Sequence, residues 1–200
     1  MRIKAIDRVM AYLSLVLMVL QLGLVLASWV LTAAMPESFP RALPSAEGIR
    51  WFMGNFVSFL QSPLLVWLLL IAMTYGAVHG SGIMHYDRRE YRQRIAMRIV
   101  SAEMVSFAVI LLLLVVVPHA ILLNVIGELF PSSFTASLVP YFCLAVIVGS
   151  LSFGTITNRL RSIPSLYDAL VWGIGRMGGC FVVYLLSFQL YYSVTFVLTP

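Results

Sequence analysis

Charged side chains are missing from five long windows of this chain, and short polar segments separate the windows. The charge-free windows are residues 9–36, 51–86, 104–127, 129–158 and 177–200. A helix needs about 20 consecutive apolar residues to cross the hydrocarbon core of a bilayer, so each window is long enough for one crossing. The windows also lack the alternating pattern of a lipid-facing barrel strand.

This pattern predicts an all-α integral membrane protein that forms a single membrane domain over residues 1–200. We expect about five transmembrane helices and two short amphipathic or re-entrant helices. The expected spans are residues 9–34, 63–80, 99–126, 137–158 and 177–198. The expected short helices are residues 45–61 and 164–175.

The first short helix is predicted because the continuous apolar sequence gives way to the periodicity of an amphipathic helix. Apolar residues recur there at steps of three and four, and polar or small residues occupy the other side. The apolar residues are Ile49, Phe52, Met53, Phe56 and Leu60, and the others are Arg50, Gly54, Asn55, Ser58 and Gln61. Ser45 offers an N-cap, and Glu47 in the first turn favours the helix dipole. Periodicity leaves open whether this helix lies on the outer surface or enters the bilayer.

Composition excludes an ordinary soluble domain. The chain is 61% hydrophobic and 10% charged, whereas globular domains have about 25% charged residues. The apolar run after the N-terminal basic residues is too long for a removed signal peptide, so we interpret it as an uncleaved first helix. Cys143 and Cys180 both fall within predicted spans, where they serve most simply as packing residues without a disulfide.

The distribution of the basic residues indicates which side of the membrane each connecting segment lies on. Of the 13 basic residues, 11 precede the first span, follow the second or lie between the fourth and fifth, and only Arg41 and Arg50 fall on the other side. This positive-inside bias predicts a cytoplasmic N-terminus and a periplasmic C-terminus in a bacterial inner membrane. The basic loops would meet the lipid bilayer, and a nucleic-acid partner is not indicated.

Few ionisable residues fall at membrane depth. His119 lies beside Pro118, which should kink the third span, and His79 and Glu103 are the other candidates. A polar residue at this depth is a functional hypothesis, with a neighbouring helix or a water as the alternative partner.

Small residues mark several helix faces. Ser150, Gly154, Thr157 and Asn158 share one face near the end of the fourth span, which suits helix packing or the lining of a polar pathway. Gly173, Gly175 and Gly178 spell G-x-G-x-x-G, but no strand precedes them, so a dinucleotide site is excluded. The glycines that we assign to helix packing are Gly76, Gly80, Gly154, Gly175 and Gly179.

A coarse internal repeat is visible in the order of elements. A span, a proline-marked connector, a short amphipathic helix and another span occur in the first third, and a similar order recurs from residue 140 to residue 199. The charge bias places the two short helices on opposite sides, which is typical of the inverted repeats of secondary transporters.

The opening third also resembles a known family. The residues that carry the resemblance are Gly48, Ile49, Arg50, Trp51, Asn55, Phe59, Pro63, Leu64, Val66, Met73, Gly76, Ser81, Gly82 and Ile83. In order and spacing they resemble the early part of the p-aminobenzoyl-glutamate transporter (AbgT) family. The resemblance covers roughly residues 1 to 85 of a chain less than half the usual family length, and His79 stands where the family has an acidic residue. It implies a bacterial inner-membrane carrier of folate breakdown products or sulfonamides.

We therefore expect a small transporter that moves a small organic anion, acting as a homo-oligomer or with a second membrane subunit. The alternative is a non-transporting accessory or assembly subunit of a membrane complex. The candidate substrate or pathway contacts are Arg50, Asn55, His79, His119, Ser150 and Asn158. Arg50 and Asn55 would contact a carboxylate, unless Arg50 pairs with Glu47 and Asn55 faces water. No metal-ligand spacing, cofactor motif or catalytic arrangement indicates an enzyme.

Overall fold

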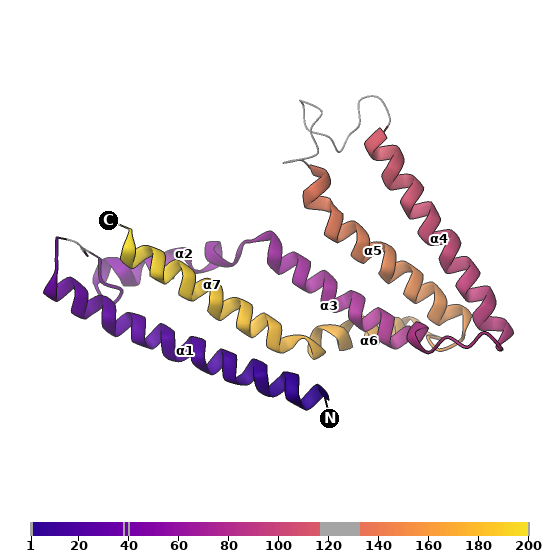
Figure 1. The fold of residues 1–200 in the computed structure, drawn as a ribbon, viewed down its shortest axis with the longest axis horizontal. Coiled ribbons are helices and arrows are strands. Elements are labelled where there is room, and N and C mark those ends of the chain that lie inside the picture. The colour runs from indigo at the N-terminus through magenta and orange to yellow at the C-terminus, as the bar shows by residue number, and fades with distance from the viewer. Residues whose placement is uncertain (1, 38, 40, 117–132, 200) are drawn as a thin grey trace. The chain divides into compact units, whose positions relative to one another are not determined.

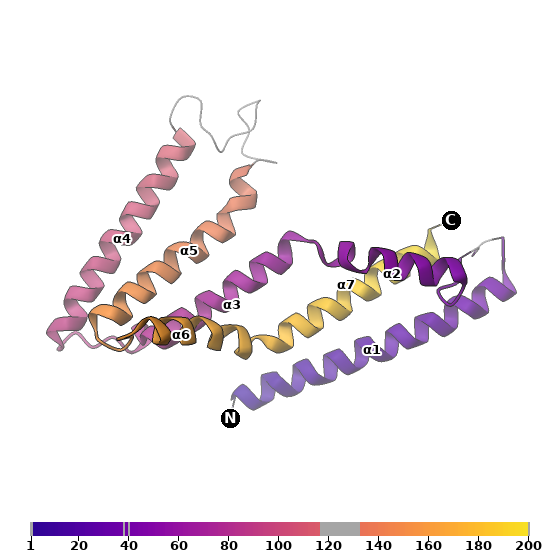
Figure 2. The same cartoon turned by 180° about the vertical axis from the view of Figure 1, so that it is seen from behind.

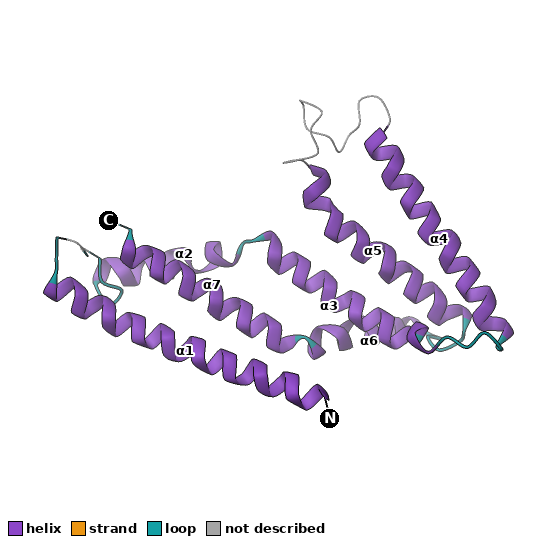
Figure 3. Ribbon diagram, viewed as in Figure 1, coloured by secondary structure: helices purple, strands orange, loops and turns teal. Residues whose placement is uncertain are grey.

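The computed structural model describes residues 2–37, 39, 41–116 and 133–199. These residues form seven α-helices and one short 3-10 helix, without a strand, which confirms the predicted all-α class (Figure 3). The elements are α1 (Arg2–Ala34), α2 (Ala46–Leu60), α3 (Pro63–Ser81), η1 (Ile83–His85), α4 (Tyr91–Val116), α5 (Ser133–Ile156), α6 (Ile163–Arg176) and α7 (Gly178–Leu198).

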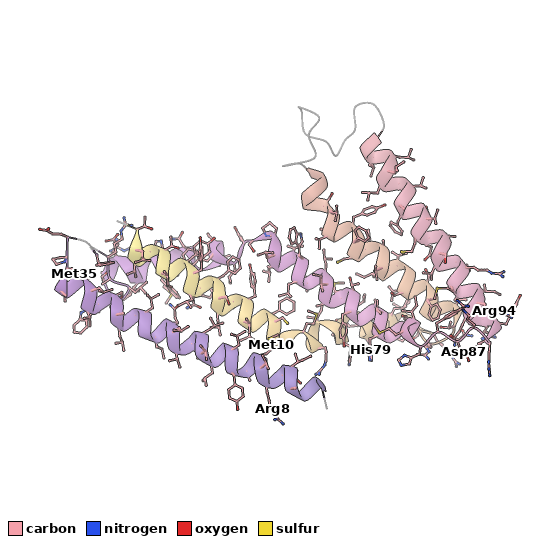
Figure 4. The ribbon with its side chains drawn as sticks, viewed as in Figure 1. Arg8, Met10, Met35, His79, Asp87 and Arg94 are labelled. Atoms are coloured by element: carbon pink, nitrogen blue, oxygen red, sulfur yellow. The ribbon has the colours of Figure 1, made fainter. Side chains whose placement is uncertain are left out.

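Five of the described helices are long and apolar enough to cross a membrane, by length and composition: α1, α3, α4, α5 and α7. The two shorter helices, α2 and α6, fall where the amphipathic segments were expected. The helix α4 begins at Tyr91, whereas the expected span began at residue 99 because Arg92, Arg94 and Arg98 interrupt the apolar sequence before it. Apolar windows locate the part of a helix that suits hydrocarbon, whereas the helix itself continues into the polar segment. Arg94 lies over the Tyr91 ring at this end of α4 (Figure 4).

The chain separates into two compact units. Unit 1 comprises Met1–Leu65 and Gly178–Pro200, and unit 2 comprises Val66–Met177. Each unit is described by itself below.

In unit 1, α1 and α7 lie side by side and run in the same direction (Figures 1 and 2). Met10 on α1 faces Gly179 on α7, whose missing Cβ would lie 3.3 Å from the Met10 Cβ (Figure 4). The segment after α1 folds back onto it: Ser28 Oγ accepts a hydrogen bond from the Leu43 N–H at 3.2 Å and donates one to the Val25 carbonyl at 2.8 Å. Ser28 is fully buried, so this hydroxyl attaches the connector to α1.

The helix α2 begins at the predicted cap and packs on α7 through aromatic rings. The Ser45 hydroxyl accepts from the Gly48 N–H at 3.0 Å, which satisfies a free donor of the first turn. Trp51 stacks on Phe196 with ring centroids 4.2 Å apart, and Phe59 stacks on Tyr192 at 4.6 Å. These stacked rings hold α2 along the C-terminal half of α7.

Unit 2 contains an antiparallel pair, α4 and α5. Ala96, Val100 and Phe153 form its buried cluster, and the Tyr141 hydroxyl donates to the Phe107 carbonyl at 2.5 Å. The helix α6 follows with a capping box, in which Ser162 and Ser165 satisfy each other's backbone N–H groups. The helices α3 and α6 cross where Gly76 meets Gly173.

Candidate functional site

The six residues expected to contact substrate do not converge within the part of the chain that the structure describes. Arg50 and Asn55 belong to unit 1, and His79, Ser150 and Asn158 belong to unit 2. His119 lies outside the described residues. The described candidates therefore do not form one site, and each has different neighbours.

Arg50 is exposed in a surface hollow that Ala46, Ile49, Met53 and Gly54 also line. Glu47 does not pair with it, because the Glu47 carboxylate lies 3.7 Å from Arg41 Nε instead. Arg41 also donates to the Thr199 carbonyl and lies over the Phe196 ring. The guanidinium of Arg50 thus remains on the surface of α2, where an anion could reach it.

Asn55 is half-buried and its side-chain amide donates to the Trp51 carbonyl one turn earlier, at 3.0 Å. This bond uses one of the two amide N–H donors of Asn55 and leaves its oxygen available. Part of the hydrogen-bonding capacity of the Asn55 side chain is therefore used within α2.

His79 is exposed on α3 and stacks on Trp172 of α6, with ring centroids 4.2 Å apart (Figure 4). It lines a hollow of about 290 Å³ in unit 2 together with Asp168, Ser165 and Trp172. The stacked imidazole lines this hollow beside Gly76, Gly80 and Ala169, the small residues where α3 meets α6.

Ser150 is 2% exposed, so it lies inside unit 2. Asn158 has a different role, because it follows Thr157 just beyond the end of α5 at Ile156 and has φ of 59°. The Arg159 N–H donates to the Gly154 carbonyl at 2.9 Å, and the Asn158 N–H donates to the Thr155 carbonyl at 3.1 Å. This bond pair defines a Schellman motif, in which asparagine tolerates the left-handed position. Asn158 is accounted for as a helix cap.

The packing glycines differ in their surroundings. Gly76 and Gly80 face α6, and a Cβ on Gly154 would lie 2.8 Å from Leu160 Cγ. Gly179 faces Met10, as described above. Around Gly175 no described atom lies within 4 Å of a Cβ position, so the close approach in α6 falls on Gly173, which we had not assigned to packing.

Two polar pairs inside the apolar helices were not predicted as pairs, although Glu103 is among the ionisable candidates at membrane depth. In unit 2, Ser152 Oγ donates to Glu103 Oε1 at 2.8 Å. In unit 1, Gln21 Nε2 donates to Ser193 Oγ at 3.0 Å. In each pair one oxygen, Glu103 Oε2 or Gln21 Oε1, is buried and has no hydrogen-bond partner among the described residues.

A signal for both pairs exists in the sequence. Gln21 is the one amide within the charge-free window 9–36, and Glu103 is the last charged residue before the window 104–127. Their partners are serines on distant helices, Ser193 and Ser152, and no spacing rule connects residues so far apart in the chain. Single polar residues in apolar runs were therefore visible, but their pairing was not.

Glu103 lies within α4, which begins at Tyr91, and not near the start of a helix at residue 99. It follows Arg98 by five residues on α4, which is about 7.5 Å along a helix axis. Gly149 of α5 leaves room for Met104 and Val100, which would lie 2.9 and 3.2 Å from a Cβ there, whereas Glu103 Oε2 would lie at an ordinary contact distance of 3.8 Å. The Oε2 atom thus lies near Gly149.

No group of three or more histidine, cysteine, aspartate or glutamate residues that could hold a metal ion occurs among the described residues. Both described cysteines, Cys143 and Cys180, are free thiols. The chain matches no protein-family model, no curated protein and no solved structure. The residues themselves therefore carry the functional argument.

Proposed function

We propose that this chain is a small gradient-coupled carrier of the bacterial inner membrane, related to the AbgT transporters, which moves a small organic anion as an oligomer. In this proposal α1, α3, α4, α5 and α7 cross the bilayer, with the N-terminus in the cytoplasm and the C-terminus in the periplasm. The charge bias described above supports this orientation. A reporter fused after Pro200 should then behave as periplasmic, and a cytoplasmic signal would refute the five-span topology.

The observation that carries the proposal is the half-buried Glu103 side chain on α4, whose Oε2 is buried. Its only described donor is the Ser152 hydroxyl, and Oε2 has no hydrogen-bond partner among the residues that the structure describes. An ionised carboxylate accepts up to about four hydrogen bonds, so a carboxyl oxygen that is kept from water without a donor is unfavourable. An ionisable group within a membrane span is a functional hypothesis by default. Taking up and releasing a proton or another cation is the function that suits a carboxyl with a free oxygen.

The same carboxyl favours the carrier hypothesis over the accessory-subunit hypothesis. A subunit that only packs against other helices needs small residues and apolar faces, and a carboxyl with an unbonded oxygen would destabilise it without contributing to its function. The specific observation in favour of an accessory subunit is the scatter of Arg50, Asn55, His79, Ser150 and Asn158 over both units. The accessory role is therefore the second candidate.

Flux in proteoliposomes tests the proposal. The reconstituted chain would be assayed for p-aminobenzoyl-glutamate and for a sulfonamide, with and without a pH or sodium gradient. The Glu103→Gln variant should lose gradient-driven accumulation, because the amide cannot exchange a proton or balance a cation. Glu90→Gln is the matched control, since Glu90 is exposed before α4 and bonds Gln93.

The outcomes are distinct. Flux no greater than in empty liposomes would refute transport of these substrates and favour the accessory subunit. Equal gradient-driven flux in Glu103→Gln and Glu90→Gln would leave a carrier but remove Glu103 from its coupling.

A further inference from the structure

One side of α4 has arginines near its start and apolar residues further along, and we name it the outer face of α4. Its residues recur at steps of three, four and seven, which place them on one side of a helix. They are Tyr91, Arg94, Arg98, Val105, Val109 and Leu112, and all six are exposed. We propose that the outer face of α4 binds a phospholipid whose headgroup carries no cation, with its phosphate on the two arginines.

The guanidiniums of Arg94 and Arg98 are available to a ligand. Within the described ranges neither donates a hydrogen bond or forms an ion pair, and Arg94 lies over the Tyr91 ring. Residues four apart on a helix have Cβ atoms about 5–6 Å apart, so both guanidiniums can reach one phosphate. A guanidinium donates two parallel hydrogen bonds to phosphate oxygens, which makes this pair well suited to a phosphate group.

The acidic residues just before α4 bind other donors. The Asp87 carboxylate accepts a hydrogen bond from the Arg89 N–H at 2.9 Å, and the Glu90 carboxylate accepts one from the Gln93 side-chain amide. Neither carboxylate forms an ion pair with a described arginine. This end of α4 therefore keeps its positive charge, which attracts an anionic headgroup and repels the ammonium group of a zwitterionic one.

The apolar part of the outer face suits an acyl chain. Val105, Val109 and Leu112 are 63%, 49% and 60% exposed, and they belong to a helix apolar enough to cross a membrane. Leu112 lies about 21 Å from Arg98 along the helix axis, so the apolar residues extend through the hydrocarbon of one leaflet, which is about 15 Å thick. A free phosphate would leave this part of the face unused, so the outer face favours a lipid.

The lipid would be a partner of the carrier and not its substrate. Glu103 bonds Ser152 of α5, and it lies about 140° around α4 from Arg98, on the side away from the outer face. The inference rests on α4 crossing the membrane as proposed above, but it does not require transport. Lipid binding and flux can therefore fail separately.

Native mass spectrometry of the full chain in detergent tests the assignment with three probes. They are phosphatidylglycerol, phosphatidylethanolamine with the same acyl chains, and glycerol phosphate as the free phosphate. We expect phosphatidylglycerol to bind about tenfold tighter than phosphatidylethanolamine, and glycerol phosphate not to compete with it. Arg94→Gln with Arg98→Gln should remove the preference. Arg88→Gln with Arg89→Gln is the matched control, since it removes the same charge before α4 and should keep most of the preference.

Equal affinity for the two phospholipids would overturn the proposal, and so would equal losses in the two double variants, which would indicate diffuse attraction. Competition by glycerol phosphate would overturn it in favour of a site for free phosphate. If the Arg94 and Arg98 variant does not fold, phosphatidylglycerol with a photoreactive acyl chain decides on the unchanged chain. It should label residues 105–112, and labelling elsewhere would overturn the proposal. The lipid preference without flux would keep this site and refute the carrier, and flux without the preference would do the reverse.

Discussion

Gly76 and Gly173 bring the backbones of α3 and α6 into direct contact within unit 2. A Cβ on Gly76 would lie 2.8 Å from the Gly173 nitrogen, and a Cβ on Gly173 would lie 2.6 Å from the Gly76 nitrogen. One turn along, a Cβ on Gly80 would lie 2.6 Å from the Ala169 Cβ. The crossing therefore depends on small residues in both helices, as in membrane helices that approach closely.

Gly76→Ala and Gly173→Ala should each destabilise the protein. The obstructing atoms belong to the backbone of the facing helix, which cannot rotate away, so the helices must separate. We expect a loss of about 1–3 kcal/mol in the free energy of unfolding, measured by SDS titration in mixed micelles with tryptophan fluorescence. Gly175→Ala is the control: its Cβ meets open space, and alanine gains up to about 1 kcal/mol in helix propensity. Similar stabilities for Gly76→Ala and Gly175→Ala would contradict the crossing.

This crossing illustrates what sequence patterns can locate. Gly76 and Gly80 were assigned to packing because their spacing of four places them on one helix face. Around α6 the same spacing occurs twice in the sequence, in Gly175 with Gly179 and in Ala169 with Gly173, although Gly179 belongs to α7 in the structure. Only the partner helix selects between them, and the structure selects Ala169 and Gly173. The number and class of the helices follow from apolar windows, which need no knowledge of partners.

The candidate site was less predictable for the same reason. Asn158 was grouped with Ser150 by helical periodicity, but the helix ends at Ile156 and periodicity no longer applies beyond it. A polar residue followed by Arg159 and Arg161 is equally typical of a helix end. Glu103 and Gln21 became informative only when the structure identified the serine beside each.

Asn158→Gly should leave stability nearly unchanged, whereas Asn158→Val should lower it by about 1–2 kcal/mol. The reason is that φ of 59° is free for glycine, tolerated by asparagine and strained for a β-branched residue. Thermal unfolding in detergent would measure both variants. Thr155→Val is the control for adding valine on the exposed surface of α5. Equal losses in the glycine and valine variants would show that the Asn158 side chain itself makes a needed contact.

Ser152→Ala should destabilise unit 2, because it removes the one described donor of the half-buried Glu103 carboxyl. The expected cost is about 1–3 kcal/mol. The double variant Glu103→Leu with Ser152→Ala should recover this loss, since replacing both partners by apolar groups removes the unmet polar atoms. SDS titration would measure both, with Ser101→Ala on the exposed side of α4 as the matched serine control. A double variant less stable than Ser152→Ala would indicate that the pair serves structure and would weaken its proposed role in coupling.

The helix α2 exposes an apolar stripe and a polar stripe. We expect the apolar stripe to face lipid and the polar stripe to face water. Ile49, Met53 and Val57 are 54%, 72% and 67% exposed and recur every four residues. Arg50, Gly54 and Ser58 are also exposed, one position further around the helix. The side that packs on the protein is neither of these, since Gly48 and Phe59 are the buried residues. An apolar stripe beside a polar one is typical of a helix at the membrane interface.

Nitroxide labels at single cysteines would place α2, in a background with Cys143 and Cys180 replaced by alanine. Labels at Met53 and Val57 should relax with oxygen, which concentrates in lipid, and a label at Ser58 should relax with a water-soluble nickel chelate. An interfacial α2 gives this contrast between residues 57 and 58. A re-entrant α2 would instead shield Ser58 from the chelate, and a helix outside the bilayer would expose Met53 to it. The contrast between neighbouring positions therefore decides which of the two arrangements left open by the periodicity the protein adopts.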